Sequence, residues 1–263
     1  MKKMLMAITA TLTLVLLHQI KTELPTSSYL FFENFDQRQP EIPWFNQDLV
    51  VKAKNSRNEP DNNILEQSYT PNKTGTPFIG KRFKLAHEVT EASLSFDVTF
   101  GNGFQFVKGG KMHGLSGGNS TTGCKAIDPD GWSVRMMWRE EGKPVLYVYH
   151  QDRLSRCGDD FVAKENFNFE KGNSYKIDIY IKMNSDTRER DGTVALYING
   201  MLAVHQESLM LSKNRNIKID SFLYSSFYGG NDPSWSPDSS TVAYFDNFVV
   251  REGHHVSDES INY

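Results

Sequence analysis

Cysteine and long apolar segments are both scarce in this sequence. The longest uncharged, mostly apolar run covers residues 4–17, which is too short to span a bilayer as a helix. It follows Lys2 and Lys3, and a basic start before a short apolar run is typical of a secretory signal peptide. We therefore expect residues 1–22 to be a signal peptide and residues 23–263 to form one secreted domain, extracellular or periplasmic.

The chain has only two cysteines, Cys124 and Cys157. Two cysteines alone make a poor metal site, whereas in an exported protein they are expected to form a disulfide. No cluster of Asp, His and Cys is visible elsewhere in the sequence. We therefore expect one disulfide, no metal and no other cofactor.

The chain has no excess of positive charge, since its formal net charge is −3. This balance does not suit general nucleic-acid binding. Residues 101–157 are an exception, because they contain eight Lys or Arg against five Asp or Glu, a net charge of +3. Such a basic segment suits an anionic ligand. We expect a monomer whose partner is an anionic polymer other than nucleic acid, with no membrane partner.

The sequence also lacks a long helical stripe and a Pro-rich linker. Residues 175–182 alternate between apolar and polar side chains, which is typical of a half-buried strand. Asn199-Gly200 stands between two apolar runs and predicts a hairpin. These patterns predict a single all-β domain, a β-sandwich or jelly roll. Further strands are expected at residues 29–35, 92–100, 103–108, 222–228 and 242–251.

Residues 109–118 are unusually rich in small side chains, with six Gly or Ser out of ten. We expect a loop there whose backbone approaches a ligand closely. Ser116 lies in a pattern that resembles the nucleophile elbow of hydrolases, but no helix is predicted after it, so that interpretation is rejected. Residues 128–131 resemble the start of a calcium loop. The twelfth position is Arg139 rather than Glu, and a tight turn is favoured.

Residues 132–150 predict a second hairpin, turning at Glu140-Glu141-Gly142. In that register Arg135 lies opposite Tyr147, and Ser133 lies opposite Tyr149. Directly opposed side chains share one face of a sheet, so these four side chains would form a polar square. The other face would be apolar and would carry Trp132, Val134, Met136, Trp138, Leu146 and Val148.

The segments 109–115, 132–139 and 146–149 resemble polysaccharide lyase family 14, which includes alginate lyases and is similar to glucuronan lyases. The resemblance is close over about 50 residues and implies a β-jelly roll with a cleft on its concave sheet. It implies a site made of Lys111, Ser133, Arg135, Tyr147 and Tyr149. Lys108, His113 and Arg139 are expected to join Ser133 in substrate binding. His113 stands where Pro is expected in many relatives, and it is expected to influence substrate preference.

The chemistry of a lyase explains these residue types. The enzyme removes the C5 proton of a uronate and expels the oxygen at C4. Arg135 suits the uronate carboxylate, because a guanidinium grips carboxylate in a bidentate manner and stabilises the charge that develops. Lys111 is a candidate base if burial and a neighbouring cation lower its pKa. Tyr147 and Tyr149 can donate a proton or act as base, and the sequence leaves this assignment open.

Two other functions are compatible with a β-sandwich of this size. A β-glucanase on the same architecture needs two facing carboxylates, and the sequence lacks the strand pattern Glu-x-Asp-x-x-Glu. A non-catalytic, lectin-like module could bind an anionic polysaccharide through the same Arg, Lys and Tyr side chains. Only an assay separates that module from a lyase that cleaves alginate or glucuronan by β-elimination.

Overall fold

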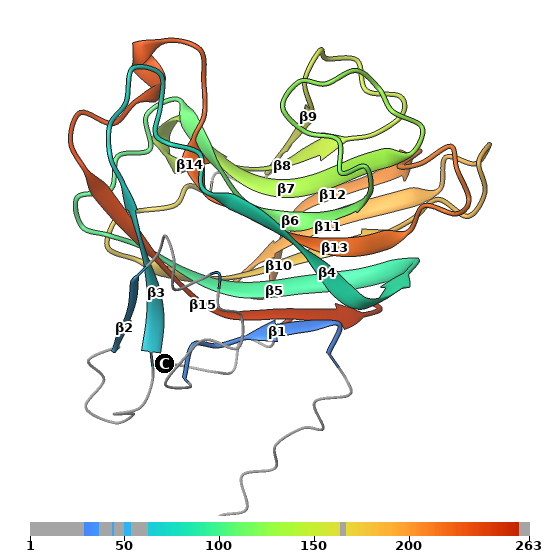
Figure 1. The fold of residues 1–263 in the computed structure, drawn as a ribbon, viewed down its shortest axis with the longest axis horizontal. Coiled ribbons are helices and arrows are strands. Elements are labelled where there is room, and N and C mark those ends of the chain that lie inside the picture. Colours follow the sequence, from blue (N-terminus) through green and yellow to red (C-terminus); the bar gives the residue numbers. More distant parts are fainter. Residues whose placement is uncertain (1–28, 37–43, 45–49, 54–62, 164–166, 258–263) are drawn as a thin grey trace, which may run out of the picture.

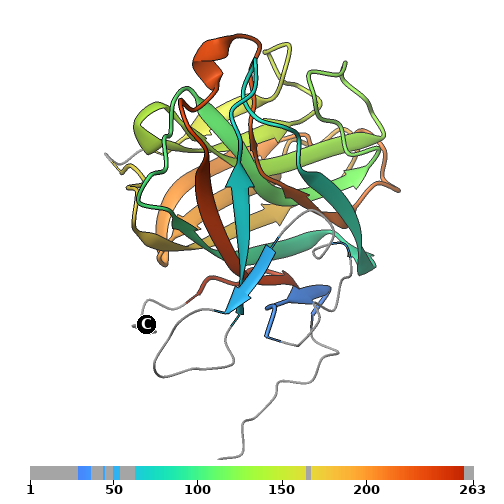
Figure 2. The ribbon, with the colours of Figure 1, turned by 60° about the vertical axis from the view of Figure 1, so that its left-hand side comes forward.

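The computed structural model describes residues 29–36, 44, 50–53, 63–163 and 167–257. Two antiparallel sheets are stacked face to face, with loops rising above the upper sheet (Figures 1 and 2). The described helical segments are two short 3₁₀ turns, η2 (Glu140–Gly142) and η3 (Pro233–Trp235). The predicted β-sandwich is confirmed. The expected signal peptide lies outside the described residues, and none of the described segments is a helix long and apolar enough to cross a membrane.

The lower sheet has eight strands and forms one wall of the core. β1 (Phe31–Glu33) pairs with β15 beside the main path. The main path runs, in spatial order, through β12 (Met201–Leu209), β11 (Gly192–Ile198), β10 (Ser174–Lys182), β5 (Glu91–Phe100), β15 (Thr241–Glu252), β3 (Asn63–Tyr69) and β2 (Val50–Ala53).

The upper sheet has seven strands and carries the predicted site. β14 (Phe227–Tyr228) pairs with one end of β6. The main path runs through β4 (Gly80–Val89), β13 (Ile219–Ser225), β6 (Gly109–Gly118), β7 (Gly131–Arg139), β8 (Pro144–Tyr149) and β9 (Asp159–Val162). β6, β7 and β8 run side by side in Figure 1.

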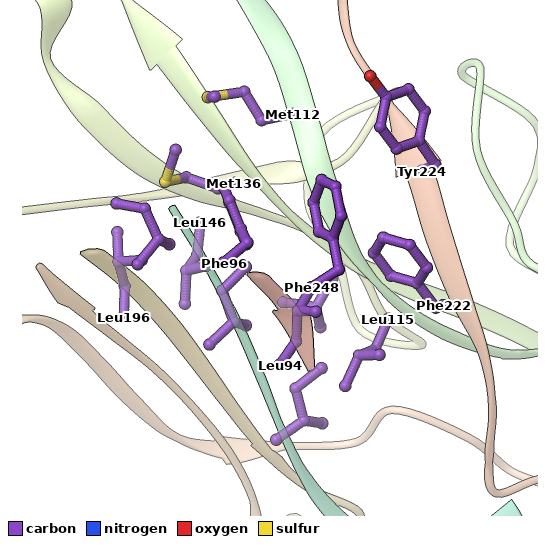
Figure 3. Packing of buried hydrophobic residues seen from close by; sticks show 14 of the residues in the cluster. Leu94, Phe96, Met112, Leu115, Met136, Leu146, Leu196, Phe222, Tyr224 and Phe248 are labelled. Carbon is purple, nitrogen blue, oxygen red and sulfur yellow. The ribbon is translucent and has the colours of Figure 1, made fainter. Parts of the chain in front are cut away.

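The core lies between the facing sides of the two sheets. Leu94 and Phe96 from β5 meet Met136 and Leu146 from the upper sheet, as Figure 3 shows. All six residues expected on the apolar face of the 132–150 hairpin belong to this cluster. Burying one face of each sheet leaves the opposite face of β6, β7 and β8 available for polar side chains.

Most predicted strands are present with small changes in their ends. The alternating segment 175–182 is β10, and Asn199-Gly200 joins β11 to β12 with positive φ at both residues. The expected turn at residues 128–131 is closed by a hydrogen bond from the Gly131 N–H to the Asp128 carbonyl.

Two predictions around the glycine-rich segment are wrong. Residues 103–108 form turns and irregular backbone rather than a strand, and residues 109–118 form the ten-residue strand β6 rather than a loop. The glycines fit a strand because neighbouring groups occupy the space of a side chain. A Cβ at Gly110 would lie 2.1 Å from the Trp138 ring, and one at Gly117 would lie 2.5 Å from the Trp132 indole nitrogen. Small residues therefore let two tryptophans pack against the backbone of β6.

Candidate active site

The β7–β8 hairpin has the register that the sequence predicts. Arg135 pairs with Tyr147 and Ser133 pairs with Tyr149. The turn at residues 140–142 has positive φ at Glu141 as well as at Gly142. The four polar side chains therefore point to one face of the upper sheet, on the side away from the main core.

Lys111 joins this face from β6. Its Nζ lies 5.6 Å from the ring centroid of Tyr147 and 5.5 Å from that of Phe227. Burial and, to a smaller extent, the nearby Arg135 and Arg139 lower the pKa of Lys111 to about 7, while Asp160 acts in the opposite direction. Lys111 can therefore be neutral for part of the time near pH 7, as a base requires.

Arg135 is a buried cation with an incomplete set of partners. The residue is only 4% exposed, and its Nε and Nη2 atoms have no hydrogen-bond partner among the described residues. Its guanidinium carbon lies 5.7 Å from the Tyr147 ring centroid and 6.0 Å from that of Tyr149. Burial lowers the pKa of Arg135, but an arginine stays protonated at neutral pH. These two donors lack partners, and the 4% of the residue that is exposed is the part that an incoming carboxylate can reach in this conformation.

Tyr147 and Tyr149 lie with their hydroxyls together under two loops. Their hydroxyl oxygens are 3.3 Å apart. The Tyr147 oxygen accepts a hydrogen bond from the Gly158 N–H at 2.9 Å, and the Tyr149 oxygen accepts one from the Cys124 N–H at 2.8 Å. Burial raises the pKa of Tyr147, so this residue keeps its proton at neutral pH and can donate it.

Ser133 shares the face of this site but is fully buried. Its hydroxyl donates a hydrogen bond of 2.6 Å to the carbonyl of Thr121. It therefore fixes the loop that follows β6, and it has no exposed surface through which to contact a substrate as expected.

The expectation for His113 does not agree with its position. The β6–β7 register shifts between Lys111 and Gly114, and His113 has no exposed surface. Its ring lies 4.3 Å from that of Tyr224 and 4.6 Å from that of Phe245. Burial lowers the pKa of His113 well below its usual value. The irregular register turns this side chain into the core, so a direct contact with substrate is excluded in this conformation.

Lys108 and Arg139 lie at the margin of the site. Lys108 is exposed, with its Nζ 3.8 Å from a carboxylate oxygen of Asp232. Arg139 forms a bidentate pair with Asp160, at 2.8 and 2.6 Å, and its guanidinium carbon lies 5.7 Å from the Tyr147 ring centroid. Arg139 thus has a protein partner, unlike the Nε and Nη2 atoms of Arg135.

Asp160 is a residue that the sequence interpretation missed. It lies on β9 opposite Tyr147. β9 has only four residues and begins with two aspartates, and carboxylates are depleted in strands. The segment therefore carries little strand signal of its own.

The predicted disulfide is confirmed. Cys124 and Cys157 are joined, and the chain contains no free cysteine. The disulfide links the loop between β6 and β7 to the loop between β8 and β9, and both loops rise above the upper sheet beside β9 (Figure 1). Within the described parts of the chain, no three His, Cys, Asp or Glu side chains are grouped so that they could hold a metal ion.

The sequence matches the family description Polysaccharide lyase 14 over residues 56–248. The chain belongs to polysaccharide lyase family 14. That family match covers the whole site, from Lys111 to Asp160, and makes the protein a polysaccharide lyase. A search of curated proteins finds no match.

Solved structures share the fold of this family 14 lyase. The alginate lyase Aly36B, solved with an alginate trisaccharide, is 25% identical with a TM-score of 0.66, over 73% of this chain and 82% of that one. The family 14 alginate lyase from Aplysia kurodai is 21% identical with a TM-score of 0.63, over 80% and 88%. The endo-β-1,4-glucuronan lyase from Trichoderma reesei is 12% identical with a TM-score of 0.56, over 85% and 95%.

Proposed function

We propose that this family 14 lyase cleaves a uronic-acid polymer, alginate or glucuronan, by β-elimination. The observation that carries the proposal is the buried guanidinium of Arg135, whose Nε and Nη2 lack hydrogen-bond partners in the described structure. A buried cation with unmet donors is costly, and a uronate carboxylate that reaches the exposed 4% of Arg135 would balance its charge. The solved relative that holds alginate supports this class of substrate.

Each residue then has a defined task. Arg135 binds the carboxylate and stabilises the negative charge that develops when the C5 proton leaves. Lys111, with its pKa lowered to about 7, removes that proton. The C4–oxygen bond breaks, and its electron pair goes to the leaving oxygen.

Tyr147 is assigned as the proton donor to that oxygen. Its pKa is raised by burial, so its hydroxyl is protonated at neutral pH. Its oxygen accepts the N–H of Gly158, so its own proton points away from that N–H, either to the Tyr149 oxygen or to the leaving oxygen of a bound substrate. The Tyr149 hydroxyl forms a hydrogen bond with the Tyr147 hydroxyl, with 3.3 Å between the two oxygens.

We also propose that the enzyme acts outside the cytoplasm. The charged start and apolar run of residues 1–22 support export, and the Cys124–Cys157 disulfide is stable in an oxidising compartment. Expression of the full chain with and without residues 1–22 tests this. Export that persists without that segment would contradict it.

The proposed function is tested by the product. The protein is incubated with alginate, glucuronan and a neutral β-glucan, and the ultraviolet absorbance of the unsaturated sugar end is followed. We expect absorbance to rise with at least one uronate polymer and not with the neutral glucan. Binding to a uronate polymer without any rise in absorbance would instead support the lectin-like module.

A further inference from the structure

The Cys124–Cys157 disulfide lies directly over the proposed proton donor. Cys124 donates its backbone N–H to Tyr149, and Gly158, the residue after Cys157, donates its N–H to Tyr147. Each end of the disulfide therefore brings a backbone donor to one of the two tyrosine oxygens. We infer that the disulfide is a positioning device for proton donation, an inference that rests on the proposed function.

The loop around Cys124 needs to be held in place. Gly123 and Cys124 both have positive φ, 66° and 59°, and the left-handed region is unfavourable for a cysteine. Without the disulfide, the segment can relax and turn the Cys124 N–H away from Tyr149. The Ser133 hydroxyl, bonded to the Thr121 carbonyl, holds only the start of this loop.

The loop around Cys157 is shaped for close approach to the tyrosine rings. A Cβ at Gly158 would lie 2.9 Å from the Tyr147 ring and 3.0 Å from the Tyr149 ring. Only glycine brings its N–H so close to the phenol oxygen without displacing a ring.

Arg153, from the same loop, crosses to the other loop. Its guanidinium carbon lies 4.9 Å from the Tyr149 ring centroid, and its Nη2 donates to the Lys125 carbonyl. The two loops therefore form a unit with the disulfide at its centre.

The two backbone N–H donors set the direction of the tyrosine O–H bonds. A phenol oxygen that accepts a fixed N–H has its own O–H directed away from that donor, toward the other tyrosine oxygen or, in the complex with substrate, toward the leaving oxygen. Loss of the disulfide should therefore slow the transfer of a proton to that oxygen. Binding of the uronate carboxylate by Arg135 should not change.

The test compares two leaving groups. In the polymer, the C4–oxygen bond breaks, the oxygen takes a proton from Tyr147, and water restores that proton. In a synthetic uronate with fluoride at C4, the same C5 proton is removed and fluoride leaves without needing a proton. A defect in proton donation should therefore slow the polymer reaction and spare the fluoride reaction.

Two variants are compared with the wild type on both substrates. The double variant Cys124→Ser with Cys157→Ser removes the disulfide. Gly158→Ala keeps the disulfide but displaces the N–H from Tyr147, and it remains informative if the double variant does not fold. We expect kcat on the polymer to fall at least about tenfold, a part of the roughly 10²–10⁴-fold that general acid catalysis contributes. We expect KM to stay within about twofold, because uniform binding is kept.

Three outcomes overturn the inference. The first is an unchanged kcat on the polymer in both variants. The second is an equal loss on both substrates, which would mean general disruption of the site. The third is a change confined to KM. If the wild type releases neither fluoride nor unsaturated polymer ends, the proposed function itself has failed, and the inference falls with it.

Discussion

At the scale of single residues, Arg135 and Lys111 represent two different uses of buried positive charge. Arg135 cannot lose its charge at neutral pH, and in the proposed mechanism a uronate carboxylate balances that charge. Lys111 can lose its proton, and its pKa of about 7 allows both protonation states near neutrality. In the proposed mechanism, Arg135 therefore binds the substrate carboxylate, while Lys111 exchanges a proton.

Replacing Arg135 with alanine should separate stability from activity. We expect kcat/KM on the polymer to fall roughly 10²-fold or more. KM should rise as kcat falls, because the carboxylate is present in both the ground state and the transition state. The melting temperature should change by less than about 4 °C, because the substitution also removes an unpaired buried charge. Arg190→Ala, at an exposed cation paired with Asp152, is the control, and a larger loss of stability for Arg135→Ala would show a packing role.

The pH dependence of activity should report Lys111. A base acts when it is neutral, so kcat/KM should rise with pH through the Lys111 pKa of about 7. Lys111→Arg keeps the charge but cannot be neutral in this range, so it should remain inactive at high pH. A full pH profile of both proteins is the measurement. Activity that is constant from pH 6 to about 8 would be inconsistent with a lysine base.

Lys111 also affects stability, with a definite sign. The folded pKa is lowered from 10.5 to about 7, so the unfolded chain binds more protons between these two values. The free energy of unfolding should therefore rise with pH across this window. Lys111→Met should flatten the slope, as measured by urea unfolding at several pH values. An equal slope of unfolding free energy against pH in both proteins would show that the pKa of Lys111 is not lowered in the folded state.

At the scale of elements, hairpins were predictable and the glycine-rich strand was not. The β7–β8 register follows from the alternation of polar and apolar residues and from a three-residue turn. The sequence alone therefore predicts that Arg135 pairs with Tyr147. The glycines of β6 show no alternation of polar and apolar side chains. Gly110 and Gly117 leave space for the rings of Trp138 and Trp132 on the neighbouring strand β7. The turn of His113 into the core depends on an irregular register that local sequence does not encode. The N–H donors over the tyrosines come from loops, where side-chain patterns contain no information on backbone direction.

A glycine substitution tests the packing of β6. Gly110→Ala would place a Cβ 2.1 Å from the Trp138 ring, and we expect it to destabilise the protein by about 1–3 kcal/mol through overpacking. Gly103→Ala is the matched control, because nothing lies within 4 Å of a Cβ there. Urea unfolding of both variants is the measurement. Equal stabilities would show that β6 has room for side chains.

At the scale of the whole molecule, the sandwich separates folding from chemistry. The core between the sheets contains Trp132, Trp138 and most phenylalanines, and the outer face of β6, β7 and β8 carries the site. A small separate cluster of Met137, Val145, Tyr147 and Tyr149 packs beneath the disulfide. Substitutions of charged residues on the outer face can therefore change activity while the fold persists.

The response of the whole protein to metal removal can also be predicted. In the proposed mechanism, Arg135 and Lys111 provide the charge and the base within the chain, so we expect turnover of a uronate polymer to survive treatment with a strong chelator. Restoration of a lost activity by added calcium or zinc would contradict this expectation and would call for a metal in the mechanism.

The most direct test of the account is the turnover of Lys111→Ala, measured beside its binding to the same uronate polymer. Lys111 lies on the outer face, away from the main core, so the variant should fold and should bind the polymer with an affinity close to that of the wild type. We predict that kcat falls roughly 10²–10⁴-fold, measured as the rate of unsaturated product. Near-normal turnover on every uronate polymer would contradict the assignment of this site as the lyase centre.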